Sequence, residues 1–128
     1  MNNQHVKVSA GVWMDNHNAM VISRPASSQE ADFEIQDKIK AKEYRGGKGE
    51  HGSNNADQAN SQHYYKDIAQ LLLPFDEILI FGPGQAQEEF QNFLKEDMHF
   101  NSKKIIIDTA DRLSDPQMIA KVRAQFTD

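Results

Sequence analysis

The sequence predicts one α/β domain with a mixed five-stranded sheet, in which an antiparallel three-strand meander is extended by a parallel pair, and with three helices. Three stretches in the first third of the chain alternate apolar and polar residues, which is typical of antiparallel strands with one buried face. Two later stretches each pass from a short apolar run to helical spacing, which predicts parallel strands joined by a right-handed crossover. At 128 residues the chain is long enough for one domain, 1–128, and too short for two.

The first two alternating stretches predict a hairpin. Val6 to Met14 places valine, alanine and methionine on one face, and Ala19 to Ile22 resumes extended structure after the turn-forming cluster Asp15 to Asn18. The third stretch is expected to bury one face and to expose a row of lysines. Its apolar residues are Phe33, Ile35, Ile39 and Ala41, and its lysines are Lys38, Lys40 and Lys42.

A polar segment separates this meander from the rest of the chain. Arg45 to Asn55 contains four glycines among serine and asparagine, and we expect a flexible loop at about 45–62. An amphipathic helix follows and ends before Pro74. Its apolar residues are Tyr64, Tyr65, Ile68, Ala69, Leu71 and Leu72.

Two strand and helix units complete the fold. Ile78 to Phe81 predicts the central buried strand, Gly82-Pro83-Gly84 ends it, and a helix with apolar residues at Ala86, Phe90, Phe93 and Leu94 comes next. Lys103 to Asp108 predicts the last strand. The last helix starts either with a capping box of Ser114 and Gln117 or with Asp115 as the cap before Pro116, and its apolar face is Ile119, Val122 and Phe126.

Composition limits the classes of function. The net charge is -5, and the excess acid lies in residues 51–128, with seven Lys/Arg against twelve Asp/Glu, whereas residues 1–50 hold seven of each. A basic field over the whole surface is therefore excluded, and any RNA contact has to be local. The lack of cysteine excludes disulfides and thiolate chemistry. No apolar run approaches a membrane span and no signal peptide is recognisable, so we expect a cytoplasmic protein without membrane contact.

The cations gather in one part of the sequence, around a pair of glycines. One interpretation is an arm that positions RNA phosphates, with glycines that let the backbone approach closely. The simpler interpretation is a solvated loop beside an ordinary exposed face. The candidate RNA-binding residues are Lys38, Lys40, Lys42, Arg45, Gly46, Gly47, Lys48 and His51.

Two other places have both a functional and a structural interpretation. Free N–H groups after Gly82-Pro83-Gly84 would suit an anion, but the segment lacks a nucleotide-binding motif and a tight turn explains it. Asp15 and Asp108 would approach each other if their strands were parallel neighbours, giving a magnesium site with Asp111 or His17. Alternatively, Asp15 forms the hairpin turn while Asp108 and Asp111 organise a loop.

Several short segments resemble one known family when they are taken in order. The chain is similar to the middle domain of the eukaryotic and archaeal peptide-release-factor and Pelota family, and closest to small bacterial stand-alone members labelled translational machinery proteins. The segments span nearly the whole chain. They are Gly11-Val12-Trp13-Met14-Asp15-Asn16-His17, Arg45-Gly46-Gly47, His63-Tyr64-Tyr65, Ile78-Leu79-Ile80-Phe81-Gly82-Pro83-Gly84, Asp108-Thr109-Ala110-Asp111 and Asp115-Pro116-Gln117.

The resemblance implies a function in translation without peptide release. In release factors a Gly-Gly-Gln tripeptide occupies the loop after the third strand, but here Lys48 follows Gly46-Gly47, so a long cation replaces the neutral amide. We therefore expect a non-enzymatic module that contacts the ribosome or tRNA and needs no cofactor. The alternatives are a metal-dependent hydrolase of nucleic acid that uses Asp15 and Asp108, and a structural module that self-associates through a free sheet edge. Monomer and homo-oligomer both remain open.

Overall fold

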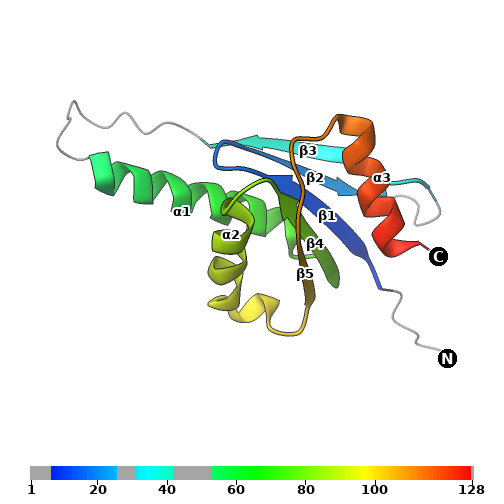
Figure 1. Cartoon of the computed structure of the whole chain (residues 1–128). Coiled ribbons are helices and arrows are strands. Elements are labelled where there is room, and N and C mark those ends of the chain that lie inside the picture. The colour runs from blue at the N-terminus through cyan, green and yellow to red at the C-terminus, as the bar shows by residue number, and fades with distance from the viewer. Residues whose placement is uncertain (1–6, 26–30, 42–52, 128) are drawn as a thin grey trace.

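The computed structural model describes residues 7–25, 31–41 and 53–127 (Figure 1). Five strands and three helices follow one another in the predicted order, with one additional turn of 3-10 helix, η2. In chain order the elements are β1 (Ser9–Met14), β2 (Asn18–Ser23), β3 (Glu34–Lys40), α1 (Ser53–Leu72), β4 (Glu77–Gly82), α2 (Ala86–Lys95), η2 (Met98–Phe100), β5 (Lys104–Thr109) and α3 (Asp115–Phe126).

The strands form one mixed sheet in the order β3-β2-β1-β4-β5. The pairs β1–β2 and β2–β3 are antiparallel, whereas β1–β4 and β4–β5 are parallel. Val12 of β1 lies opposite both Val21 of β2 and Ile80 of β4, so the two central strands join the meander to the parallel pair. The predicted fold class is confirmed.

Helices cover both faces of the sheet, with α1 and α2 on one face and α3 on the other (Figure 1). Alternate residues of each central strand therefore enter different cores. Val12 packs with Ile68 and Phe90 in the core under α1 and α2, while Trp13 packs with Val122 in the core under α3. Strand β4 is buried on both sides, which explains its continuous apolar run.

Helix α1 begins earlier than its apolar pattern predicts. The helix starts at Ser53, so the predicted loop at about 45–62 overlaps its first turns, and residues 45–52 lie outside the described part of the chain. The first turns of α1 extend beyond the sheet (Figure 1), and their sequence is mostly polar. The helix ends at Leu72, as Pro74 predicts. None of the described helices has both the length and the apolarity that are needed to cross a bilayer.

Strand β3 contains a β-bulge that changes which of its faces is buried. Ile39 pairs with Ala19 of β2, but Ile35 pairs with Ile22, which leaves Gln36 as the extra residue. Ile35 consequently packs in the α3 core and Ile39 in the α1–α2 core. The prediction of a single buried face for this strand was wrong, because an inserted residue reverses the sides of everything beyond it.

Helix α3 starts with the capping box that was one of the two predicted alternatives. The Ser114 side chain accepts a hydrogen bond from the backbone N–H of Gln117, and the Gln117 side chain accepts one from the N–H of Ser114. The helix packs closely on β1, because a methyl group added at Gly11 would overlap Val122. Glycine at position 11 therefore sets how near α3 approaches the sheet.

Candidate nucleic-acid interface

The turn between β1 and β2 anchors both ends of the segment that carries the predicted cationic arm. The Asp15 side chain accepts hydrogen bonds from the backbone N–H groups of His17 (2.8 Å) and Asn18 (2.7 Å), which fixes the turn. The N–H of Ala41, just after β3, donates to the carbonyl oxygen of His17 at 2.8 Å. The hydroxyl of Tyr64 on α1 donates to the carbonyl oxygen of Asp15 at 2.9 Å. This turn therefore holds the end of β3 and the middle of α1, on the two sides of the predicted arm.

Two tyrosines of α1, Tyr64 and Tyr65, are buried and hold the helix in place. Tyr64 and Tyr65 are 3% and 6% exposed. Burial, then the negative charge of Asp15 and then Tyr65, raise the pKa of Tyr64 well above its ordinary range. Burial, followed by the hydrogen bond from its hydroxyl to Glu89, likewise raises the pKa of Tyr65. Both hydroxyls therefore stay protonated and remain hydrogen-bond donors.

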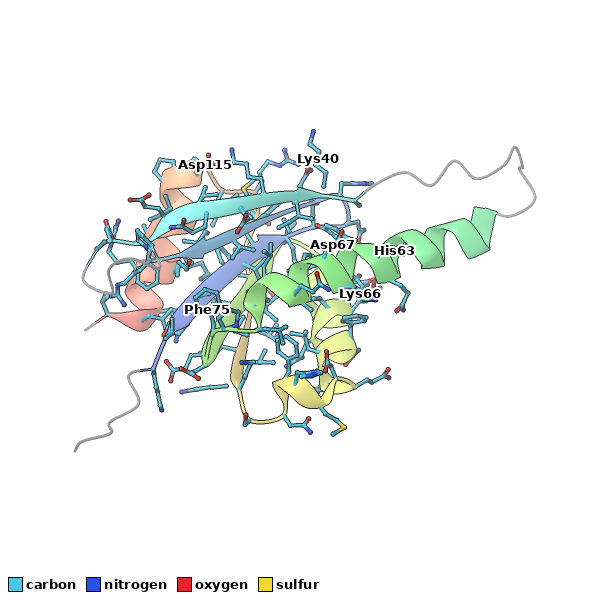
Figure 2. All side chains as sticks on the ribbon, turned by 180° about the vertical axis from the view of Figure 1, so that it is seen from behind. Lys40, His63, Lys66, Asp67, Phe75 and Asp115 are labelled. Atoms are coloured by element: carbon cyan, nitrogen blue, oxygen red, sulfur yellow. The ribbon has the colours of Figure 1, made fainter. Side chains whose placement is uncertain are left out.

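Lys38 and Lys40 are the predicted RNA-binding residues that the structure describes. Both are exposed on β3, in agreement with the predicted lysine row. The ammonium of Lys38 lies 3.8 Å from a carboxylate oxygen of Asp115 on α3, and with side chains 63% and 52% exposed this pair is weak. Figure 2 shows Lys40 at the end of β3 where the chain leaves the sheet, and Asp115 at the start of α3.

The other candidates, Lys42, Arg45, Gly46, Gly47, Lys48 and His51, lie outside the described residues. Their role stays a prediction. The structure fixes the two positions between which they are connected, namely Lys40 at the end of β3 and Ser53 at the start of α1.

Helix α1 contributes exposed polar residues that were not among the candidate RNA-binding residues. His63, Lys66 and Asp67 are all exposed, and Figure 2 shows them along the helix. Their charges are mixed. The early start of α1 connects Lys66 to the predicted arm through continuous helix, a relation that only the helix boundary reveals.

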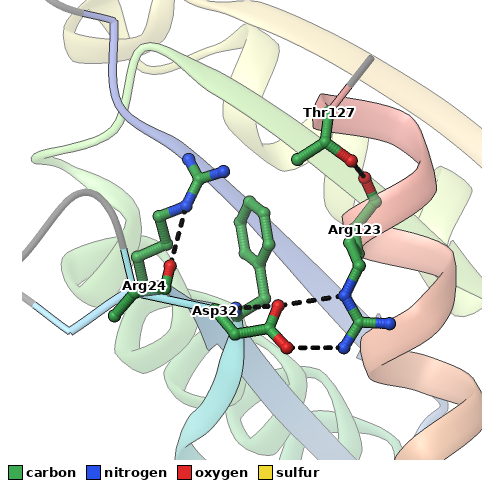
Figure 3. A network of polar contacts seen from close by, with 6 residues as sticks. Arg24, Asp32, Arg123 and Thr127 are labelled. Atoms are coloured by element: carbon green, nitrogen blue, oxygen red, sulfur yellow. Dashed lines mark hydrogen bonds and ion pairs between the residues drawn. The ribbon is translucent and has the colours of Figure 1, made fainter.

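The two arginines nearest the other end of β3 are occupied in structural contacts (Figure 3). Arg123 of α3 makes two hydrogen bonds to the Asp32 carboxylate, at 2.9 and 2.8 Å, which hold the pKa of Asp32 below its ordinary value. Arg24 donates to the carbonyl oxygen of Ala31 at 3.0 Å and lies over the Phe33 ring. These two arginines connect α3 and the end of β2 to the start of β3, which is the opposite end of that strand from Lys40.

The segment Gly82-Pro83-Gly84 has the features of a structural turn. Gln87 is fully buried, and its side-chain amide donates to the carbonyl oxygen of Gly82 at 3.0 Å. Glu88 and Glu89 occupy the first turn of α2, where their charges oppose an anion. The buried Gln87 was missed, because an isolated glutamine on a helix gives no sign in the sequence that it closes a loop.

The candidate metal ligands are not brought together. Strand β4 lies between β1 and β5, so the ends of the strands that carry Asp15 and Asp108 are two strand spacings apart, about 10 Å. Asp15 binds its own turn, whereas Asp108 accepts from the ammonium of Lys121 at 2.7 Å, and this bond lowers the pKa of Asp108. Within residues 7–25, 31–41 and 53–127, no three His, Asp or Glu side chains are arranged to hold a metal ion. The strands are not neighbours, so the condition for the predicted site with Asp111 is not met.

A metal titration is expected to leave stability unchanged. Each carboxylate already has a local partner and the two are separated, so magnesium or manganese should not shift the melting temperature. The measurement is a thermal melt at increasing metal concentration, with calcium as a comparison. A saturable rise in the melting temperature that disappears in an Asp15→Asn variant would contradict this expectation.

Solved structures share this arrangement of strands and helices. Archaeoglobus fulgidus Pelota matches with a TM-score of 0.61 and 13% sequence identity, covering 93% of this chain and 31% of that chain. Archaeal translation termination factor aRF1 matches with a TM-score of 0.56 and 11% identity, covering 94% and 35%. A model of ribosome-bound archaeal Pelota and ABCE1 matches with a TM-score of 0.57 and 21% identity, covering 91% and 32%.

The chain is similar in fold to Pelota and aRF1. The resemblance predicted from the short segments is thus confirmed for the Pelota-like fold, while the predicted closeness to stand-alone bacterial members stays a prediction. The chain spans about a third of the length of these structures. No protein-family model matches the sequence, and a search of curated proteins finds no relative. Identities this low establish the fold alone, and the activity has to be argued from the site.

Proposed function

We propose that this protein is a non-enzymatic binding module of the translation machinery that contacts the ribosome or tRNA in the cytoplasm. The observation that carries the proposal is the Pelota-like fold over more than nine tenths of the chain, because one matching structure is of Pelota bound to the ribosome. The contact would be made by Arg45, Gly46, Gly47 and Lys48, together with Lys38 and Lys40 of β3.

The anchoring of the arm supports this proposal. Ala41, just after β3, and Tyr64, within α1, are both hydrogen-bonded to the turn at Asp15 to Asn18, so this turn ties together the two elements between which the predicted arm is connected. Lys38 and Lys40 are exposed on the strand that leads into the predicted arm, where they can contact phosphate groups. Lys48, where release factors have glutamine, offers a cation to phosphate and no neutral amide for the reacting ester. We therefore infer binding without peptide release.

A ribosome co-sedimentation experiment tests the proposal. Replacing Arg45 and Lys48 by alanine removes two phosphate contacts, so we expect at least about tenfold weaker binding and a shallower dependence of log K on log salt, by about 2. The double variant Lys95→Ala with Arg112→Ala removes the same charge from exposed sites elsewhere, and it should bind like the wild type.

The outcomes separate three cases. Equal losses in both double variants would show that only net charge matters and would contradict a specific arm. No sedimentation of the wild type at low salt, with ribosomes and with tRNA in a parallel assay, would overturn the proposal. Hydrolysis of peptidyl-tRNA by the wild type would overturn its non-enzymatic part.

A further inference from the structure

The two edges of the sheet differ in how they are protected against pairing with another strand. At one edge, β3 carries the bulge at Gln36 and exposed charged side chains, features that discourage further strand addition. At the other edge, β5 consists of Lys104, three consecutive isoleucines that are all partly exposed, Asp108 and Thr109. Among the described residues β5 pairs only with β4. An apolar, unbulged edge of this kind is a template for another strand.

The backbone hydrogen bonds determine which groups of β5 face outward. The N–H of Lys104 donates to Asp76 at 2.9 Å and the N–H of Ala110 donates to Gly82 at 2.8 Å, both toward the β4 side. Because backbone groups alternate along a strand, even-numbered residues here face β4. The N–H and C=O groups of Ile105 and Ile107 therefore point to the free edge.

We propose that β5 pairs antiparallel with β5 of a second copy of this chain, around a two-fold axis that passes through Ile106. In this register Ile105 of each copy lies opposite Ile107 of the other, and their outward N–H and C=O groups form four hydrogen bonds. Lys104 of each copy then lies opposite Asp108 of the other. The strand is thus complementary to itself both in its hydrogen bonds and in its charges.

Charge complementarity favours this register over registers in which the two strands are shifted along each other. Lys104 and Asp108 fall in non-hydrogen-bonded pairs, where opposite side chains approach most closely. Both lie on the face of the sheet that α3 covers, because Asp108 is paired to Lys121 of α3 and Lys104 lies four positions before it on the same side of the strand. The Asp108 side chain is 50% exposed, so its carboxylate is accessible to a second cation. Shifting the two-fold axis by one residue, to Ile107, would place Lys104 opposite Ala110 and lose both charge pairs.

The pairing would join two sheets into one. An isologous contact of this kind closes on itself and gives a dimer with no further growth through β5. A single short strand buries little surface, so the dimer should be weak and should form only at high protein concentration. The site lies at the opposite edge of the sheet from Lys38 and Lys40, which separates it from the proposed RNA contact.

Two charge-reversed variants test the register through their mixture. Lys104→Glu places acid opposite acid and Asp108→Lys places base opposite base, so each variant alone should dimerise at least about tenfold more weakly than the wild type. An equimolar mixture restores an opposite pair at both positions, and it should form a heterodimer as tightly as the wild type. The measurement is sedimentation equilibrium across a concentration series.

The neighbouring exposed residues Lys66 and Asp67 on α1 provide the matched control. Lys66→Glu and Asp67→Lys change the charge equally and should each dimerise like the wild type. A wild type that stays monomeric at its highest soluble concentration would overturn the proposal, as would single variants that dimerise unchanged. Ribosome binding can fail without affecting this result, because it is measured on different residues.

Amide hydrogen exchange provides a test without mutations. The Ile105 and Ile107 amides should exchange fast in dilute protein and become protected at high concentration, whereas the inward Ile106 amide should be protected at both. Exchange of Ile105 and Ile107 that is independent of concentration, in samples shown to be dimeric, would place the interface elsewhere and contradict the proposal.

Discussion

Replacing Gly82 by alanine is expected to lower the free energy of unfolding by about 3 kcal/mol. A methyl group at this position would overlap the carbonyl oxygen of Met14, which belongs to the neighbouring strand β1. A backbone atom in a central strand cannot rotate away as a side chain can, so β1 and β4 have to separate. Gln87, which binds the carbonyl of Gly82, would be displaced as well. The change should be measured by urea denaturation followed through the fluorescence of Trp13, the only tryptophan.

Gly84 provides the control for this experiment, because a methyl group added there meets no atom within 4 Å. Gly84→Ala should therefore leave stability within about 0.5 kcal/mol of the wild type. Equal effects of the two substitutions would show that chain entropy in the turn, and not the contact with Met14, determines the cost.

Alkaline pH is expected to destabilise the protein steeply. Burial raises the pKa of Tyr64 and of Tyr65 from the ordinary value of 10.0, so both stay protonated in the folded chain while tyrosines of the unfolded chain ionise. Above pH 10 the unfolded state then binds fewer protons than the folded state, and stability falls as pH rises. At pH 11 the loss is about 1.4 kcal/mol for each tyrosine.

Phenylalanine variants isolate this contribution, because phenylalanine cannot ionise. Tyr65→Phe should reduce the slope of unfolding free energy against pH between 10 and 11 by about half, whatever its effect at pH 7. The slope is obtained from urea denaturation at each pH. A double variant of both tyrosines with an unchanged slope would assign the alkaline loss to other groups.

Those elements whose residues enter a core were predictable from the sequence. The run from Ile78 to Phe81 and the pattern from Ala86 to Leu94 each have the period of their element, so the parallel pair and its helices follow from hydrophobic spacing. The start of α1 was not predictable in this way, because its first turns, from Ser53 to Asn60, are mostly polar in sequence and apolar spacing cannot mark them.

Features that depend on single contacts could not be predicted from the sequence pattern. The bulge at Gln36 depends on the register between two strands, and the burial of Gln87 depends on one hydrogen bond to Gly82. At the candidate site, the exposure of Lys38 and Lys40 was predictable from alternation. The separation of Asp15 from Asp108 was not, because strand order depends on long-range pairing that local spacing does not encode.

The shared anchoring of Ala41 and Tyr64 has a consequence for a nicked chain. Cleavage between residues 42 and 52 would produce one fragment with β1 to β3 and another with α1 to α3, β4 and β5. Ala41 would stay bonded to His17 within the first fragment. The hydroxyl of Tyr64 in the second fragment would still donate to the carbonyl oxygen of Asp15 in the first, and the pairing of β1 with β4 would also bridge the fragments. We therefore expect the two pieces to stay associated after limited proteolysis and to reassemble when they are expressed separately.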